Sequence, residues 1–251
     1  MQCSALIHFC FYAIIHLKVG DVMLLYFVRH GHPDYANDCL TELGRKQAAA
    51  AAERLKNCGI EQIYSSSNGR ALQTAMYTAK VLDLQVTPYD FIREIDWHSI
   101  DGETILENGH PWNISDVFIL EGKTLTDKDR YMKEPYCNSN IVRSAQTVKN
   151  GLDAWLAELG YQREGEYYRV LDNATEKTIA MFSHGGSSSV ALSHILNIPF
   201  PQICGIARPD YTSITILDFS NEIGELILPK LLLLNDAQHI KDLNIQNIYE
   251  K

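Results

Sequence analysis

Three features are scarce in the 251-residue sequence, and each scarcity argues against a class of protein. Its six cysteines are scattered and no two form a Cys-x-x-C pair, so a zinc ribbon or a thiol redox motif is poorly supported. Basic residues are outnumbered, 22 Lys and Arg against 31 Asp and Glu, and the net charge is −9. Because such a surface repels polyanions, we expect no nucleic acid partner.

A long apolar run is also missing. The stretch from Ala5 to Leu17 is mostly apolar, but it is too short to cross a membrane, and we expect no membrane partner. No Lys or Arg precedes it and no small-x-small cleavage site follows before Gly20, which argues against a signal peptide. With cysteines that suit a reducing compartment, these features favour a cytoplasmic protein.

Apolar strands and amphipathic helices alternate along the chain. Strands are predicted over 24–28, 60–65, 85–88, 178–182, 213–219 and 226–234, and helices over 42–57, 69–82, 141–159 and 187–196. This alternation predicts an α/β fold, a three-layer α/β/α sandwich with a mostly parallel central sheet.

The domain boundaries follow from the same pattern. We expect residues 1–22 to be an N-terminal extension, 23–235 to be the folded domain and 236–251 to be a polar tail. Residues 98–140 are rich in Gly and Pro and show little periodicity, so they are predicted to be a lid insertion with loops and one short helix.

Aromatic residues lie in or beside that insertion. They are Trp97, Trp112, Tyr131 and Tyr136. They could stack on an aromatic or sugar substrate, or they could pack the lid onto the domain. The second interpretation is favoured.

Two histidines directly follow predicted strands. His30 follows the strand over 24–28 and His184 follows the strand over 178–182. In parallel sheets ligands bind beyond the carboxyl ends of the strands, so we expect both side chains at one edge. Arg29 precedes His30, and a guanidinium beside an imidazole would pair with phosphate oxygens.

Five motifs in order carry a resemblance to a known family. They read Arg-His-Gly at 29–31, Leu-Thr-Glu-Leu-Gly at 40–44, Ser-Ser-Ser-Asn-Gly-Arg at 65–70 and Phe-Ser-His-Gly-Gly at 182–186, with Arg-Glu-Ile-Asp-Trp-His-Ser-Ile-Asp-Gly at 93–102 between the last two. Together they resemble the histidine phosphatase superfamily, in the branch that includes cofactor-dependent phosphoglycerate mutase.

The resemblance implies a role for each residue. His30 would be the phosphorylated nucleophile, and Arg29 and Arg70 would hold the phosphoryl oxygens. His184 would assist catalysis and bind the same group, and Glu94 would be the general acid and then the base that activates water. Neither a metal nor a cofactor is required.

Some positions leave alternatives open. Asp96 is a rival to Glu94 as the acid. His32, followed by Pro33, stands where the family commonly has other residues, and it could bind substrate or be a surface residue. A further alternative is a metal site in which His184 and Asp96 complete the pair His30-x-His32. Arg29 would then lie beside a cation, which is unfavourable.

The predicted function is a phosphatase that hydrolyses a small phosphomonoester through a phosphohistidine on His30. A phosphoglycerate-type mutase and a non-catalytic phosphate-binding module are the alternatives. The insertion has only four basic residues against numerous acids, which suits a doubly anionic mutase ligand poorly. A small phosphorylated substrate is the expected partner, and a homodimer is left open.

Overall fold

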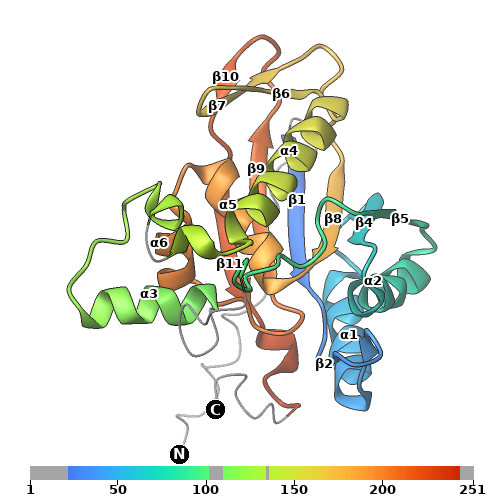
Figure 1. The fold of residues 1–251 in the computed structure, drawn as a ribbon. Coiled ribbons are helices and arrows are strands. Elements are labelled where there is room, and N and C mark those ends of the chain that lie inside the picture. The colour runs from blue at the N-terminus through green and yellow to red at the C-terminus, as the bar shows by residue number, and fades with distance from the viewer. Residues whose placement is uncertain (1–21, 102–109, 134–135, 244–251) are drawn as a thin grey trace, which may run out of the picture.

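The structure, a computed structural model, describes residues 22–101, 110–133 and 136–243. A six-stranded sheet in the order β11-β9-β1-β8-β4-β5 forms its centre (Figure 1). The strands are β1 (Val22–Arg29), β4 (Gln62–Ser66), β5 (Val86–Tyr89), β8 (Thr178–Ser183), β9 (Ile214–Ser220) and β11 (Lys230–Asp236). Strands β1, β8, β4 and β5 are parallel, whereas β9 is antiparallel to both of its neighbours. The predicted mostly parallel sheet is confirmed.

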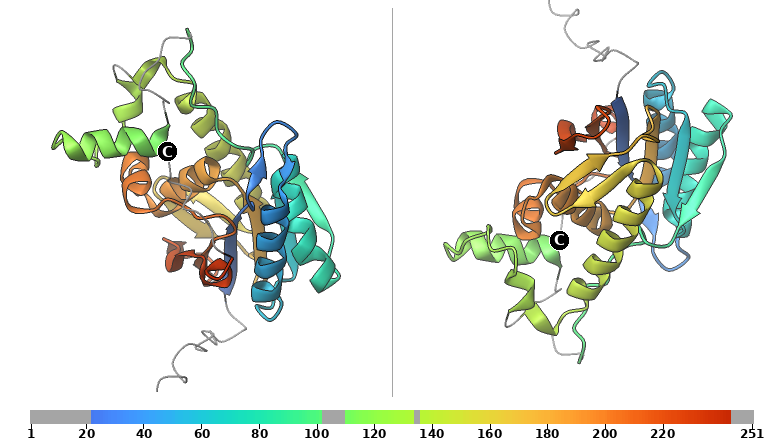
Figure 2. Two further views of the ribbon diagram at one scale, coloured as in Figure 1. Left: turned by 90° about the horizontal axis from the view of Figure 1, so that it is seen from below. Right: turned by 90° about the horizontal axis from the view of Figure 1, so that it is seen from above.

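Two helix layers cover the two faces of this sheet (Figure 2). The helices are α1 (Glu42–Leu55), α2 (Gly69–Leu82), α4 (Ile141–Glu158) and α5 (Gly185–Leu196). Successive side chains of a strand point to opposite faces. In β1, Met23, Leu25 and Phe27 therefore join the core with α4 and α5, while Tyr26 and Val28 join the core with α1 and α2. The predicted three-layer sandwich is confirmed.

Helix ends follow the expected capping chemistry. Thr41 is the N-cap of α1, and its Oγ1 accepts a hydrogen bond of 3.1 Å from the Gly44 backbone N–H. Helix α2 ends at a left-handed Asp83 and α5 at a left-handed Asn197. The predicted helices agree with the observed ones within two residues at each end.

One predicted strand is wrong. The apolar run over 226–234 is not a single strand, because Pro229 interrupts it and cannot donate a ladder hydrogen bond. The run divides into β10 (Leu226–Ile227) and β11, which belong to different sheets. Strand β10 extends an unpredicted hairpin of β6 (Tyr161–Glu164) and β7 (Tyr167–Val170) into a three-stranded sheet.

In the part of the insertion that the structure describes there is one α-helix, α3 (Pro111–Leu120), as expected. Figure 1 shows α3 beside α6 (Phe200–Ile206), away from the central sheet, and Ser115 Oγ donates to the Pro201 carbonyl at 2.9 Å. Tyr131 and Tyr136 are buried in the main core, as expected of residues that pack the insertion onto the domain. Two short 3-10 turns contain them.

The remaining elements are small. A two-stranded sheet of β2 (Pro33–Asp34) and β3 (Cys39–Leu40) follows β1, and a 3-10 turn over Gln238–Ile240 buries Ile240 near the end of the described chain. Residues 1–21 and 244–251, which hold most of the predicted extension and tail, lie outside the described residues. None of the described helices has the length and apolar character needed to cross a membrane.

Candidate active site

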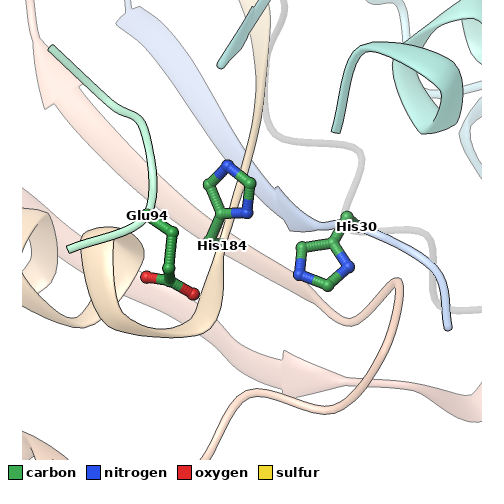
Figure 3. A group of neighbouring side chains, drawn as sticks. All are labelled: His30, Glu94 and His184. Atoms are coloured by element: carbon green, nitrogen blue, oxygen red, sulfur yellow. The ribbon is translucent and has the colours of Figure 1, made fainter. Parts of the chain in front are cut away.

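His30 and His184 lie next to each other at the carboxyl end of the sheet (Figure 3). Arg29 and Ser183 are partners in the β1–β8 register, so the residues that follow them leave adjacent strands. The His30 backbone N–H donates to the Ser183 carbonyl at 3.0 Å. Both imidazoles are buried, and their ring centres are 5.1 Å apart. The sheet itself therefore sets the spacing of the two rings.

Arg70 reaches this pair from the first turn of α2. Its Nε donates to His30 Nε2 at 3.4 Å, and its Nη1 donates to Asp38 Oδ1 at 2.5 Å. The other oxygen of Asp38 accepts the Gly69 backbone N–H at 2.6 Å, at the N-terminus of the same helix. Burial alone would raise the pKa of Asp38, but these hydrogen bonds lower it overall. Asp38 is therefore an anion that holds Arg70 against His30.

Arg29 lies near the two histidines and is held at one end. Its Nη1 donates to the Pro209 carbonyl at 2.5 Å, and its guanidinium carbon lies 4.3 Å from the centre of the Tyr211 ring. Its Nε is buried and has no hydrogen-bond partner among the described residues. A buried donor without a partner costs free energy unless a ligand supplies one.

The hydrogen bonds of His30 define its tautomer. Its Nδ1 lies 2.7 Å from the Gly31 carbonyl, which can only accept, so Nδ1 carries the proton. Burial lowers the pKa of His30 well below its usual range, and the nearby Arg29 charge lowers it further. His30 is therefore neutral, and its Nε2 offers a lone pair.

His184 has one ring nitrogen engaged and one without a partner. Its Nε2 lies 2.8 Å from Ser66 Oγ, at the end of β4. Its Nδ1 is buried and unpaired within the described residues. Burial lowers the pKa of His184, and the charges of Arg70 and Arg29 lower it further. A neutral ring with a protonated Nδ1 would donate a hydrogen bond to an oxygen in the site.

Glu94 completes the group (Figure 3). Its Oε1 accepts the backbone N–H groups of Ile95 at 3.1 Å and Ser187 at 3.2 Å. Burial raises the pKa of Glu94, although the Arg29 charge opposes this shift. A carboxyl group that keeps its proton toward neutral pH is suited to general acid catalysis.

Two glycines make room for this arrangement. A Cβ at Gly186 would lie 2.7 Å from Glu94 Oε1 and 2.5 Å from an Ile95 carbon. A Cβ at Gly185 would lie 3.0 Å from the ring of Trp112. The Gly-Gly pair after His184 therefore lets the start of α5 approach the carboxyl group and the insertion at once.

Asp96 and His32, whose roles the sequence leaves open, lie in different positions relative to the site. The side chain of Asp96 is exposed and accepts from the His98 backbone N–H at 3.0 Å and from Asn140 Nδ2 at 2.9 Å, so it points toward the insertion. His32 is close to the site, but its Nδ1 lies 3.0 Å from Thr41 Oγ1 and its ring packs edge-on against Tyr211.

Of the residues expected for the metal alternative, His30 and His184 lie together, and Glu94 takes the place of His32 and Asp96. One ligand atom each from His30, Glu94 and His184 lies within 4.8 Å of the others, a spacing that would admit a cation. The charges of Arg29 and Arg70, however, lower the pKa of both histidines, which means that the local potential is positive. A positive potential opposes a cation and favours an anion such as phosphate.

Comparison with known families agrees with this charge pattern. Residues 25–115 and 138–230 match the sequence profile of the histidine phosphatase superfamily (branch 1). The chain belongs to this superfamily. Among curated histidine phosphatase relatives, a protein named probable phosphoglycerate mutase GpmB from Proteus mirabilis is 34% identical over 209 residues, covering 76% of this chain and 86% of the relative.

Solved histidine phosphatase structures share the fold. A phosphoserine phosphatase variant from Entamoeba histolytica in complex with phosphoserine is 21% identical, with a TM-score of 0.58, covering 87% of this chain and 99% of that one. The native mycobacterial glucosyl-3-phosphoglycerate phosphatase is 25% identical, with a TM-score of 0.57, covering 84% and 98%.

Sequence analysis missed several residues around this histidine phosphatase site. Asp38, Ser66 and Tyr211 contact Arg70, His184 and Arg29 respectively, as described above. Each comes from a loop or strand end whose pairing depends on the tertiary fold.

Proposed function

We propose that this protein is a metal-independent phosphatase that hydrolyses a small phosphomonoester through a phosphohistidine on His30. The observation that carries the proposal is that two buried imidazoles, a carboxyl group whose pKa is raised by burial and two guanidinium groups lie close together. Phosphoryl transfer depends mainly on positioning and on stabilising negative charge, and this set supplies both.

The first step is attack by His30 Nε2 on phosphorus. A P–N bond forms and the bond from phosphorus to the leaving oxygen breaks. Glu94 gives its proton to that oxygen, which departs as an alcohol. Arg29 Nε, which is unpaired among the described residues, binds a phosphoryl oxygen during transfer, and His184 Nδ1 does so in the tautomer that has its proton there.

The second step returns the enzyme to its starting state. Glu94, now a carboxylate, takes a proton from water as the water oxygen attacks phosphorus. The P–N bond breaks, its electrons return to Nε2, and inorganic phosphate leaves. The hydrogen bond from Nδ1 to the Gly31 carbonyl keeps the ring in one tautomer throughout.

A mutase is the second candidate, because the relative from Proteus mirabilis is named a probable phosphoglycerate mutase. A mutase must hold a second anionic group of its ligand. In the described part of the insertion, Lys123, Lys128 and Lys133 are each paired with a carboxylate. That pairing leaves these cations engaged, and it favours hydrolysis.

The test uses 4-nitrophenyl phosphate with a metal chelator present. We expect the wild-type protein to release phosphate and His30→Ala to lose that activity by at least about 10³-fold, since no nucleophile remains. Acid quenching of the wild type should trap phosphate bound to protein. Activity that survives His30→Ala, or that the chelator removes, would contradict the proposal, and interconversion of 2- and 3-phosphoglycerate would favour the mutase.

A further inference from the structure

The insertion brings aromatic rings to the edge of the catalytic group. His110 is the N-cap of α3, and Trp112 is the second residue of that helix. The Trp112 ring carbons lie 3.0 and 3.3 Å from the position that a Cβ of Gly185 would occupy, and Arg29 Nε lies 3.6 Å from the same position. Trp112 is therefore next to both Arg29 and the residue that follows His184.

Three rings gather at this point, which we call the aromatic wall: Trp97, His110 and Trp112. The ring centres of His110 and Trp112 are 4.1 Å apart, and those of Trp97 and His110 are 4.6 Å apart. Trp97 comes three residues after Glu94, from the other end of the insertion. The wall thus connects the general acid to the first helix of the insertion.

The indole N–H of Trp112 has no hydrogen-bond partner among the described residues. The side chain is 8% exposed, and its Nε1 is buried. The ring atoms nearest to Gly185 are Cη2 and Cζ2, on the six-membered ring of the indole. This edge of Trp112 and Arg29 Nε, which is also unpaired among the described residues, therefore lie around the same position.

The wall carries no charge near neutral pH. Burial lowers the pKa of His110 to about 4, and the charges of Arg29 and Arg208 lower it further. His110 is therefore neutral, and indole rings are uncharged. Flat, uncharged rings bind flat apolar groups by dispersion and stacking, and the unpaired N–H can bind one polar atom.

We propose that the aromatic wall is the leaving-group subsite and that the natural substrate is a monophosphate of an alcohol carrying a flat, uncharged ring. This inference rests on the proposed phosphatase activity and adds its substrate class. The phosphoryl group would bind between Arg29 and Arg70, and the ring would lie against Trp112 and His110. A leaving group with a second phosphate or a carboxylate would find no charged partner in the wall itself.

The experiment compares substrates whose leaving alcohols differ in shape but little in acidity. They are phenethyl phosphate, which has a flat ring, cyclohexylethyl phosphate, which has a puckered ring, and butyl phosphate. O-phosphoserine and 3-phosphoglycerate test anionic leaving groups. We expect kcat/KM of the wild-type protein to be about tenfold higher for phenethyl phosphate than for the other four.

Trp112→Leu should remove this preference. It should lower kcat/KM for phenethyl phosphate by about tenfold, and it should leave butyl phosphate within about twofold. Trp112→Phe keeps a flat ring and should retain most of the preference. The control is Leu120→Ala, since Leu120 is on the same helix but 86% exposed, and it should change no substrate.

The two proposals fail in different ways. If none of the five compounds is hydrolysed, and 4-nitrophenyl phosphate is not hydrolysed either, the phosphatase proposal fails. If phosphate is released but the wild type prefers the anionic or aliphatic substrates, or Trp112→Leu slows all substrates equally, only the substrate class is overturned. If Trp112→Leu does not fold, the wild-type ranking and Trp112→Phe still decide the question.

Discussion

Glu94 connects burial with catalysis at the scale of a single residue. Its carboxyl group is held by two backbone N–H groups on one oxygen, which leaves the other oxygen to carry a proton. The shift of its pKa toward neutral comes first from burial. A general acid matters most when the departing alcohol is weakly acidic. A strongly acidic alcohol such as nitrophenol can depart as an anion, without a proton from the acid.

Glu94→Gln should therefore show a loss that depends on the substrate. We expect kcat to fall about 10²- to 10⁴-fold for an alkyl phosphate and much less for 4-nitrophenyl phosphate. Steady-state rates for the two compounds check this. Asp96→Asn, at the rival acid, is the matched control and should leave both rates nearly unchanged, because its side chain points toward the insertion. A large loss in Asp96→Asn would mean that the acid has been misassigned.

At the scale of an element, the start of α5 determines where Glu94 lies. Gly186→Ala would place a Cβ within 2.7 Å of Glu94 Oε1, so the carboxyl group must move. Displacement of a catalytic group by about 1 Å can cost about 10²-fold in rate. We expect Gly186→Ala to reproduce the leaving-group dependence of Glu94→Gln while the protein stays folded by circular dichroism.

Gly185→Ala offers a contrast on the same helix. Its Cβ would meet the Trp112 ring and not the carboxyl group. The rate ratio between phenethyl phosphate and 4-nitrophenyl phosphate, which both carry a flat ring, should therefore keep its wild-type value in this variant. If both glycine variants changed that ratio alike, a general distortion of α5 would explain the result better than movement of Glu94.

Local patterns predicted the elements with a continuous apolar run or helical spacing and failed for the short strands that have neither. Strands β1 and β8 are continuous apolar runs, and α4 has apolar residues at helical spacing, so their signals are strong. Strands β6 and β7 mix exposed and buried residues without an apolar run, and neither was predicted. The break at Pro229 had a readable signal, since proline rarely lies within a paired strand.

The residues of the site also differ in whether the sequence around them carries a local signal. The residues in strand-end or helix-start motifs, His30, His184, Arg29, Arg70 and Glu94, are brought together by the fold as the motifs predicted. The residues that position them were missed, because their partners are remote in sequence and no local pattern joins them. The packing of Trp112 beside Gly185 is of this second kind.

For the whole molecule, buried neutral histidines predict instability in acid. Burial is the first cause that lowers the pKa of His110 and His239, each to about 4, and it also lowers those of His30 and His184. The unfolded chain binds these protons near pH 6.5 and the folded chain only far below it. The stability from these groups is therefore complete above pH 6.5 and lost as the pH falls.

Urea denaturation measures this loss. Between pH 7.5 and pH 5, His110 and His239 should each lose about 2 kcal/mol of unfolding free energy. Glu94 acts in the opposite direction, because its raised pKa makes its contribution fall as the pH rises. His239→Gln should reduce the acid loss by about 2 kcal/mol, whereas the exposed His98→Gln should not change it. Equal stability at the two pH values would contradict the prediction.

The hydrogen bond from Arg29 to the Pro209 carbonyl has a consequence for synthesis of the chain on the ribosome. The nucleophile and its guanidinium neighbour are translated early, but the carbonyl and the Tyr211 ring that hold Arg29 are translated about 180 residues later. A nascent chain therefore carries His30 long before Arg29 is fixed. Under the proposed function, the site is therefore incomplete until Pro209 and Tyr211 have been translated.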